Sequence, residues 1–202
     1  MSGVVIIGAG HAGGRTAQYL REFGYSDEIR IFGDENVLPY ERPPVSKQLL
    51  NGKKNIDDCL LHKKEFYIEK NIEIYLNNKI SLVDFDKKEI IDNKNKIYNY
   101  SKLVFANGAS PIKLNLKKLE GIFYLRSYND SFKIQNSVTS SKNICIIGAG
   151  FIGLEIAAIL RQQYDDKKIT IIDASNSILN RNSNKNIRKK ISNIHQENNI
   201  NF

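Results

Sequence analysis

The hydrophobic pattern at the start of the chain predicts a strand, a helix and a second strand in close succession. Val4–Ile7 is an uninterrupted apolar run, as expected for a strand of a parallel sheet that is buried on both faces. Apolar residues recur at helical spacing from Ala12 to Phe23, and Gly24 is placed to end that helix. Ile29–Phe32 is the second apolar run. This order predicts a βαβ unit.

The same pattern returns towards the other end of the chain. Ile144–Ile147 and Ile169–Ile172 are apolar strands with a helical apolar stripe between them. The stripe consists of Ile152, Ile156, Ile159 and Leu160. The two copies lie about 140 residues apart, which is too far for a solenoid repeat and indicates two nucleotide-binding units.

Other elements are predicted between and after these units. Pro43 and Pro44 stiffen the loop Leu38–Lys47, and Ser46 is expected to cap a short helix through Leu50. Alternating polarity over residues 78–100 is typical of a small antiparallel meander. The remaining expectations are a buried strand within Lys102–Pro111, a domain boundary near residues 112–120, a helix over Asn184–Gln196 and the beginning of a strand at residues 199–202.

Each βαβ unit carries the motif G-x-G-x-x-G directly after its first strand. The glycines are Gly8, Gly10 and Gly13 in the first copy, and Gly148, Gly150 and Gly153 in the second. The first glycine allows a tight turn, the second lets a pyrophosphate approach the backbone, and the third lets helix and strand pack closely. The N–H groups at the start of the helix then face the phosphates. The alternative is that the glycines serve packing alone.

An acidic residue stands at the end of the second strand in both units. Asp34 follows Gly13 by 21 residues, and Asp173 follows Gly153 by 20. A carboxylate at this position accepts a hydrogen bond from a ribose hydroxyl. Because Asp173 would repel a 2′-phosphate and no arginine directly follows it, the hypothesis for the second site is NAD(H) over NADP(H). FAD at one site and NADH at the other is the useful pair, because a flavin accepts a hydride and releases electrons singly.

Composition and charge narrow the function classes. The net charge of +8 raises the possibility of nucleic-acid binding, but the densest basic run, Arg181–Lys190, has no aromatic residue that would stack on bases. A solvated helix face explains this run better, so no nucleic-acid partner is expected. No apolar run approaches the roughly 18 residues needed to span a bilayer, and no signal peptide is seen, so the expected location is cytoplasmic. Cys59 and Cys145 have no metal-binding spacing.

Four segments together resemble the FAD-dependent ferredoxin/rubredoxin–NAD(+) reductases, putidaredoxin reductase-like members of the pyridine nucleotide-disulfide oxidoreductase superfamily. They read "VVIIGAGHAGGRTAQYL", "IRIFGDENVLPYERPPVSK", "LVFANGASP" and "ICIIGAGFIGLEIAA". The resemblance implies an α/β, Rossmann-like FAD/NAD(P)-binding fold with two dinucleotide-binding units and the meander in the first. It places an FAD-binding domain at residues 1–114 and an NAD-binding domain at 115–202. It also implies electron transfer from NADH through the flavin to a ferredoxin or rubredoxin.

The resemblance further implies roles for individual residues. Those expected around the FAD are Gly8, Gly10, Ala12 and Gly13 at the pyrophosphate, Asp34 and Glu35 at the adenosine ribose, Ile80 at the adenine, Arg42 and Lys47 at the flavin, and Arg126 near the FAD phosphates or the flavin edge. Those expected to bind NAD(H) are Gly148, Gly150, Ile152, Gly153, Glu155 and Asp173. Lys47 and Glu155 are implied to pair beside the reactive edge of the flavin and are the candidate catalytic residues. On spacing alone, Glu155 is equally well a solvated helix carboxylate, and the alternative for Lys47 is a solvated lysine.

Absent features refine this expectation. No cysteine stands near "ERPPVSK", where disulfide reductases carry their redox cysteines, so electrons are expected to leave singly to an iron–sulfur protein. Family members are about twice as long, so the resemblance implies a truncated reductase without its returning FAD segment and C-terminal domain. The alternative is a non-catalytic nucleotide-binding remnant.

Overall fold

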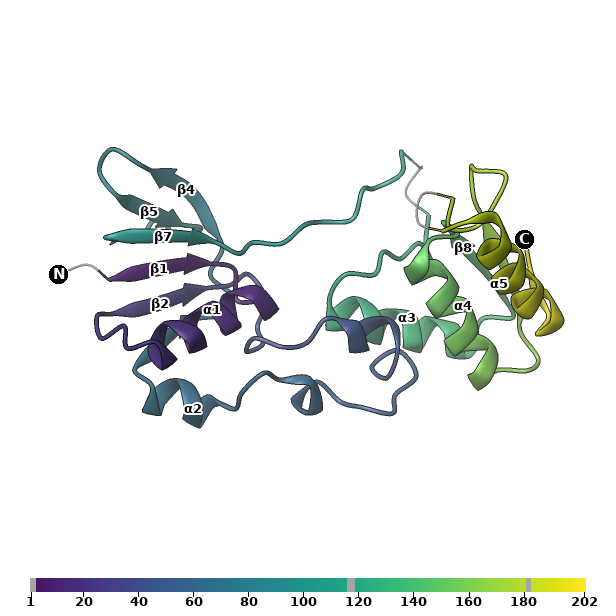
Figure 1. The fold of residues 1–202 in the computed structure, drawn as a ribbon, viewed down its shortest axis with the longest axis horizontal. Coiled ribbons are helices and arrows are strands. Elements are labelled where there is room, and N and C mark those ends of the chain that lie inside the picture. Colours follow the sequence, from purple (N-terminus) through teal and green to yellow (C-terminus); the bar gives the residue numbers. More distant parts are fainter. Residues whose placement is uncertain (1–2, 116–118, 181–182) are drawn as a thin grey trace. The chain divides into compact units, whose positions relative to one another are not determined.

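The computed structural model describes residues 3–115, 119–180 and 183–202, which form two compact units. The first unit contains residues up to Arg42 together with Ile56–Ser110. The second contains Pro43–Asn55 together with Pro111–Phe202. Figure 1 shows that each unit has its own sheet and helices. The predicted fold class, two Rossmann-like α/β units with a meander in the first, is confirmed.

A four-stranded parallel sheet forms the centre of the first unit, in the order β3-β2-β1-β7. Its strands are β1 (Val4–Ile7), β2 (Ile29–Phe32), β3 (Ile72–Tyr75) and β7 (Lys102–Phe105). Because successive strand residues point to opposite faces, the sheet has two cores. Val4, Ile6, Ile29 and Ile31 pack with Ala17 of helix α1 (His11–Glu22) and Tyr67 of helix α2 (Lys64–Glu69).

The antiparallel meander supplies the core on the other face of this sheet. It consists of β4 (Ile80–Asp84), β5 (Glu89–Asp92) and β6 (Ile97–Asn99). Val5 and Phe32 pack there with Ile90 and Tyr98. Phe32 lies flat against the Tyr75 ring, with centroids 4.6 Å apart. The first sheet is therefore covered on both faces, as predicted for β1.

Asp92 is a buried carboxylate that holds the meander hairpin together. Its Oδ1 accepts hydrogen bonds from the backbone N–H groups of Lys94 (2.8 Å) and Lys96 (2.9 Å). Its Oδ2 accepts one from the Asn78 amide at 3.1 Å and one from the Tyr98 hydroxyl at 3.3 Å. Burial alone would raise the pKa of Asp92, but these donors outweigh it and lower the pKa.

The second unit contains a three-stranded parallel sheet with the order β10-β9-β8. Its strands are β8 (Asn143–Ile147), β9 (Lys168–Ile172) and β10 (Ile200–Asn201), and its helices are α3 (Tyr128–Ser140), α4 (Phe151–Gln163) and α5 (Lys185–Glu197). Ser127 and Asp130 form a capping box at the start of α3, and Asn184 caps α5 through its side chain. The core gathers Leu154, Ala157 and Leu160 of α4 against Ile169 and Ile171.

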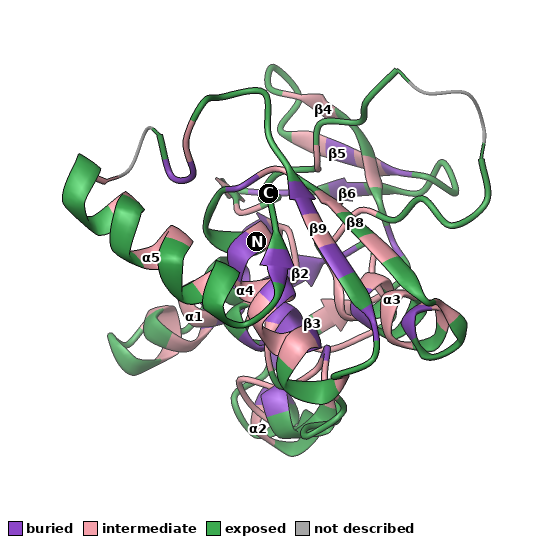
Figure 2. Cartoon of the chain, turned by 90° about the vertical axis from the view of Figure 1, so that its right-hand side faces the viewer, coloured by how far each residue is buried: buried purple, intermediate pink, exposed green. Residues whose placement is uncertain are grey.

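Only one face of this second sheet is covered by the described residues. Along β9, the buried Ile169 and Ile171 alternate with the exposed Lys168 and Ile172 and the half-buried Thr170, which Figure 2 shows by colour. Cys145 is exposed on the opposite face, as are Ile147 (62% exposed) and Ile172 (53%). The meander that covers the corresponding face in the first unit has no counterpart among the described residues of the second.

Four expectations about local structure are corrected. Ser46 does not cap a helix, because it is the last residue of a short 3-10 helix, η1 (Pro43–Ser46), which is followed by turns. The two prolines favour this tight turning, and the N–H groups of Lys47 and Leu49 both donate to the Pro44 carbonyl. Phe23 lies just beyond α1 and is 86% exposed, stacked on Tyr19. Strand β7 is not fully buried, because it lies at a sheet edge and Phe105 is 56% exposed.

The fourth correction concerns the apolar stripe of α4. Ile152 is 56% exposed rather than part of the core, because the side of α4 that faces the sheet passes through Leu154, Ala157 and Leu160. The other predicted elements are confirmed: α5 covers the expected helical range, Gly24 ends α1 with φ +84°, and β10 lies within residues 199–202.

In both units, an arginine closes the end of the helix that follows the glycine turn, α1 in the first and α4 in the second. Arg21 and Arg161 stand at the same offset from Gly13 and Gly153. The Arg21 guanidinium donates to the carbonyl oxygens of Tyr25, Asp27, Lys70 and Asn71. The Arg161 guanidinium donates to those of Tyr164, Asp165, Lys167 and Asn199. Each arginine thus ties the loop after the helix to the loop before the third strand of its sheet.

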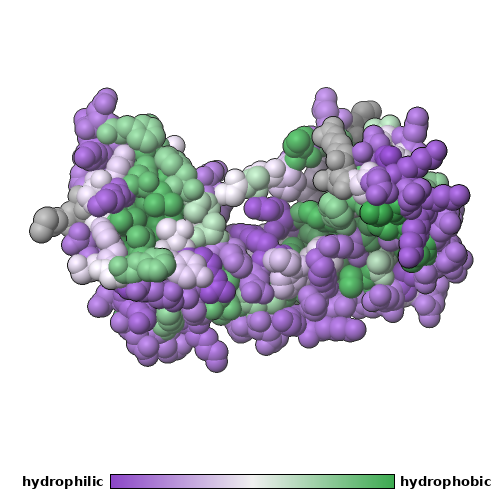
Figure 3. Space-filling model, in the orientation of Figure 1, coloured by the Kyte–Doolittle hydropathy of each residue, from purple (hydrophilic) through white to green (hydrophobic). Residues whose placement is uncertain are grey.

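None of the helices in the described ranges combines the length and apolar character needed to cross a bilayer. Figure 3 shows apolar side chains gathered over the strands of the first unit. The exposed rings of Phe85 and Phe105, also in this unit, have centroids 6.4 Å apart.

Candidate dinucleotide-binding sites

The first glycine turn has two glycines that the fold itself requires. Gly8 has φ +117°, and a Cβ there would stand 2.2 Å from the Ala106 carbonyl oxygen. A Cβ on Gly13 would stand 1.9 Å from the Gly8 carbonyl oxygen. No side chain fits at either position, so these two glycines close the turn against the sheet.

Gly10 differs from its two neighbours in the motif. Its φ is −89°, which any residue adopts, and the nearest atom to an added Cβ is the Arg42 guanidinium at 3.6 Å. It is the N-cap of α1 without a side-chain cap, so the first N–H groups of the helix are available to an anion. Ala12, in the first turn, is exposed. The open space at Gly10 therefore fits a pyrophosphate against the backbone.

The second glycine turn repeats this arrangement. Gly148 has φ +111°, and a Cβ on Gly153 would stand 2.0 Å from the Gly148 carbonyl oxygen. Gly150 is the uncapped N-cap of α4 with φ −81°, and an added Cβ would meet no atom within 4 Å. Exposed Ile152 lies in the first turn of α4. Both turns thus leave room at the middle glycine, where a dinucleotide would lie.

The two acidic residues at the ends of the second strands sit differently. Asp34 is exposed. The residue that occupies the position of Asp173 in the first unit is Gly33, where a Cβ would stand 2.4 Å from the Ala9 side chain. In the second unit, Asp173 Oδ2 accepts a hydrogen bond from the Ala149 N–H at 2.7 Å, and Oδ1 accepts one from Ser175 N–H at 2.7 Å. Asp173 therefore braces the second glycine turn directly.

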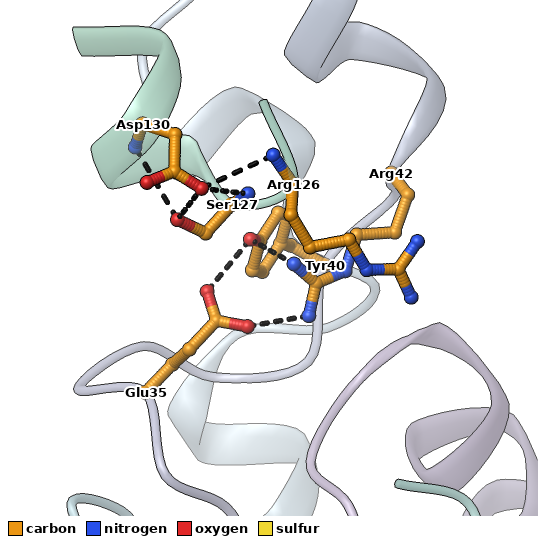
Figure 4. Close-up of polar contacts among 6 residues, drawn as sticks. All are labelled: Glu35, Tyr40, Arg42, Arg126, Ser127 and Asp130. Carbon is orange, nitrogen blue, oxygen red and sulfur yellow. Dashed lines mark hydrogen bonds and ion pairs between the residues drawn. The ribbon is translucent and has the colours of Figure 1, made fainter. Parts of the chain in front are cut away.

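Glu35 is held in a polar cluster rather than standing free beside Asp34 (Figure 4). Its carboxylate accepts a hydrogen bond from the hydroxyl of buried Tyr40 at 2.8 Å and forms an ion pair with Arg42. Arg42 also donates to the Tyr40 hydroxyl at 2.6 Å. This cluster holds the Arg42 guanidinium beside Gly10, with one nitrogen 3.6 Å from where an added Cβ would stand.

Ile80, expected at the adenine, lies at the start of β4 and is half-buried against the meander core. The segment leading to it runs beside the acidic loop, because Asn78 N–H donates to the Gly33 carbonyl and Asn77 N–H to that of Glu35. Ile80 therefore follows, by two residues, a segment that is hydrogen-bonded to the loop of Asp34.

Arg126 belongs to the second unit and precedes α3. Its N–H donates to Asp130 Oδ2 at 3.1 Å, beside the capping box that Ser127 forms with the same carboxylate (Figure 4). Its expected role near the FAD stays a prediction.

Lys47 and Glu155 are brought together within the second unit. Lys47 Nζ lies 2.8 Å from Glu155 Oε2, and each side chain is a little over one-third exposed. The same oxygen accepts a hydrogen bond from the Ser46 hydroxyl at 2.7 Å. Burial by itself would raise the pKa of Glu155, but the hydrogen bonds from Lys47 and Ser46 and the Lys47 charge lower it. The pairing implied by the family resemblance therefore exists in the fold.

Two residues of these polar clusters were not predicted from the sequence: Tyr40, which contacts Glu35 and Arg42, and Ser46, which contacts Glu155. The hydroxyl of Ser46 was expected to cap a helix, and nothing in the local sequence connects it to a carboxylate 109 residues away. The signal for Tyr40 was its place in "PYERPP", beside Arg42.

A cavity of about 630 Å³ adjoins the second glycine turn. Its walls include Ala149, Asp173 and Ile178, together with Lys185, Arg188 and Lys189 of α5. Among the residues that the structure describes, no cluster of metal-ligating side chains occurs, and Cys59 and Cys145 are not bonded to each other. The chemistry that fits this arrangement is nucleotide binding through backbone N–H groups and a bracing carboxylate.

Fold and sites together define an α/β protein with two dinucleotide-binding units. A family model described as pyridine nucleotide-disulphide oxidoreductase matches residues 2–202, and the chain belongs to this family. A rubredoxin-NAD(+) reductase of Ectopseudomonas oleovorans is 37% identical over 180 residues, which cover 88% of this chain and 46% of that protein. Putidaredoxin reductase of Pseudomonas putida is 31% identical over 183 residues, covering 88% and 43%. The chain thus spans less than half the length of these relatives.

Solved structures give the same result. The covalent putidaredoxin reductase–putidaredoxin complex superposes with a TM-score of 0.93 at 28% identity, over 99% of this chain and 49% of the other. NADH:rubredoxin oxidoreductase from Clostridium acetobutylicum superposes with a TM-score of 0.88 at 26% identity, over 99% and 52%. The resemblance to this reductase family noted from the sequence is confirmed.

Proposed function

We propose that this chain carries the FAD- and NAD(H)-binding units of a flavoprotein reductase that passes electrons from NADH to a small redox protein. The observation that carries this proposal is the open space at Gly10 and Gly150. Neither glycine is required by φ or by protein packing, whereas their neighbours in the motif are. The approach of a ligand to the backbone explains why both positions lack a side chain.

The proposed FAD site is the turn at Gly8, Gly10, Ala12 and Gly13, within residues 1–114. The N–H groups of α1 and the Arg42 guanidinium would hold the pyrophosphate, because both present hydrogen-bond donors at Gly10. Asp34 would accept from the adenosine ribose, and the cluster of Glu35 would position Arg42. FAD supplies the exchange between hydride transfer and single-electron transfer.

The proposed NAD(H) site is the turn at Gly148, Gly150 and Gly153, within residues 115–202. Exposed Ile152 would contact the dinucleotide, and Asp173 would accept from its adenosine ribose. Asp173 also fixes the N–H of Ala149, so the carboxylate would hold the turn and the ribose together.

Lys47 and Glu155 are the proposed catalytic residues, placed beside the reactive edge of the flavin. Their ion pair favours the ionised form of the Glu155 carboxyl, in line with its lowered pKa, and directs the Lys47 ammonium. Arg126 and Ile80 are proposed to contact the FAD, as the family resemblance implies.

The proposed electron acceptor is a ferredoxin- or rubredoxin-like protein in the cytoplasm. The names of the relatives support this partner, and the segment "ERPPVSK" itself contains no cysteine that would provide a disulfide route. The proposal includes neither a nucleic-acid nor a membrane partner.

Flavin absorbance tests the proposal in its two parts. The purified protein should be yellow, or become so with added FAD, and NADH should bleach the flavin band under anaerobic conditions. Binding of FAD without bleaching would favour the second candidate, a nucleotide-binding remnant that does not turn over. Absence of any flavin or nucleotide binding would contradict both.

A further inference from the structure

The hydroxyl of Ser46 is buried next to a half-exposed ion pair, that of Lys47 and Glu155. Ser46 is 8% exposed, whereas the side chains of Lys47 and Glu155 are 37% and 35% exposed. Its Oγ donates to Glu155 Oε2 at 2.7 Å, on the same oxygen that Lys47 Nζ reaches at 2.8 Å. One carboxylate oxygen therefore takes two donors, one neutral and buried, the other charged and half-exposed.

The backbone that carries Ser46 is firmly seated. Pro44 and Val45 are buried beside it in η1, which packs against α3 and α4, and Leu50 is fully buried. The N–H groups of Lys47 and Leu49 bond to the Pro44 carbonyl at 3.0 and 2.9 Å. The Ser46 hydroxyl thus starts from a fixed backbone and needs only one side-chain torsion to reach Glu155.

The two donors contribute differently to the position of the carboxylate. The long Lys47 side chain loses several rotamers on binding, and its ammonium adapts to many carboxylate positions. The serine hydroxyl is short, buried and directional, so it selects one orientation. Among the described residues, Lys47 is the charged side chain that pairs with Glu155 and lowers its pKa through its charge.

We propose that Ser46 is a positioning residue that fixes the Glu155 carboxylate, so that Glu155 in turn directs the Lys47 ammonium. The effect on flavin reduction rests on the proposed function, whereas the positioning of the Glu155 carboxylate by Ser46 does not and can be measured without a nucleotide. Without the Ser46 donor, Glu155 loses a hydrogen bond that favours its ionised form, and the ion pair samples more orientations.

The test measures the carboxyl of Glu155 directly in the full chain without nucleotide. Carbon-13-labelled glutamate is titrated by NMR, and the Glu155 signal is assigned by its loss in Glu155→Gln. Ser46→Ala should raise the pKa of Glu155, and Ser46→Thr, which keeps the hydroxyl, should restore it. The matched control is Ser131→Ala, because Ser131 is 1% exposed on α3 in the same unit and its Oγ has no hydrogen-bond partner among the described residues. That control should leave the Glu155 pKa unchanged.

Ser46→Cys covers the case in which the alanine variant does not fold. The thiol is nearly isosteric but a weak donor, so Ser46→Cys should raise the Glu155 pKa while Ser46→Thr does not. An unchanged Glu155 pKa in both Ser46→Ala and Ser46→Cys, or an equal rise in Ser131→Ala, overturns the proposal.

A second measurement separates this inference from the proposed function. With FAD bound, Ser46→Ala should slow flavin reduction by NADH about tenfold, the lower end of what one lost hydrogen bond to a charged group implies. If the wild-type protein shows no flavin reduction, the proposed function fails while the titration still decides on Ser46. If flavin reduction proceeds but the pKa of Glu155 is the same in the Ser46 variants as in the wild type, the positioning role is wrong and the proposed function stands.

Discussion

Gly153 lies so close to Gly148 that a methyl group on it would stand 2.0 Å from the Gly148 carbonyl oxygen. The contact joins the first and third glycines of the second motif and leaves the middle one, Gly150, in open space. Packing within the protein therefore requires glycine at position 153 but places no steric requirement on position 150.

The first prediction follows from this difference. Gly153→Ala should destabilise the second unit by about 3 kcal/mol, because the new methyl group meets backbone. Gly150→Ala should change stability by no more than about 1 kcal/mol, since the losses and gains at an N-cap glycine are both small. Urea unfolding measures the stability, and quenching of NADH fluorescence measures binding. Gly150→Ala should weaken NADH binding although the fold is intact; undiminished binding would contradict a dinucleotide at this turn.

The second prediction concerns Lys47. Lys47→Ala should slow flavin reduction by NADH about tenfold or more, because the ammonium directed by Glu155 is lost beside the flavin. Stopped-flow absorbance at the flavin band measures the rate. Exposed Lys53, from the same segment, provides the control: Lys53→Ala should leave the rate unchanged. An unchanged rate in Lys47→Ala would remove Lys47 from the mechanism.

The third prediction concerns the choice between NADH and NADPH. Asp173 is the acidic side chain of a cavity that Lys185, Arg188 and Lys189 also line. Asp173→Ala should therefore narrow the preference for NADH over NADPH about tenfold, because the charge that repels a 2′-phosphate is lost while the cations stay. Dissociation constants for both nucleotides measure the ratio. Asp166→Ala, before β9, should leave the ratio unchanged, and a wild-type preference for NADPH would contradict the role of Asp173.

The fourth prediction is a pH dependence of stability that arises from Asp92. Because the folded state lowers the pKa of Asp92 below the usual 3.8, its contribution is fully present above that value and is lost as the pH falls through the folded pKa. The urea midpoint of unfolding, measured at several pH values between about 2 and 6, should decrease towards low pH. In Asp92→Asn this decrease should be smaller. Asp86→Asn, on the exposed β4–β5 turn, should keep the acid limb of the wild type.

The fifth prediction concerns the duplicated arginines. Arg161→Lys should destabilise the chain by about 1–2 kcal/mol, because an ammonium cannot reach four carbonyl oxygens in the fork geometry of a guanidinium. Arg21→Lys should act in the same direction, with a smaller effect because more of its bonds are exposed. Arg15→Lys, on the same helix as Arg21, is the control for a single side-chain bond. Equal stabilities of all three variants would show that the carbonyl clusters are not stabilising.

Much of this architecture could be predicted from the sequence. The strands of both βαβ units are apolar runs, and the turns between strand and helix require glycine, so local pattern and backbone geometry agree there. The ion pair between Lys47 and Glu155 followed from the family resemblance alone, because neither residue's local sequence points to the other.

The unpredicted features depend on tertiary position. Ser46 reads locally as a cap, and only the packing of η1 against α4 turns it towards Glu155. Ile152 has the period of a core residue, but the helix rotation places it outward. Asp34 follows Gly13 by 21 residues, whereas Asp173 follows Gly153 by 20, and this difference already indicated that the two acids are not equivalent. In the structure, the closely packed Gly33 occupies the position that Asp173 holds in the second unit.

The one-sided covering of the second sheet has a practical consequence for spectroscopy. Cys59 is 2% exposed, whereas Cys145 is exposed on the open face of β8. A maleimide dye added to the native chain should therefore attach at a single position without any engineered mutation. Its fluorescence would report whether that face is wet or covered, and could be followed during cofactor titration or after a redox protein is added.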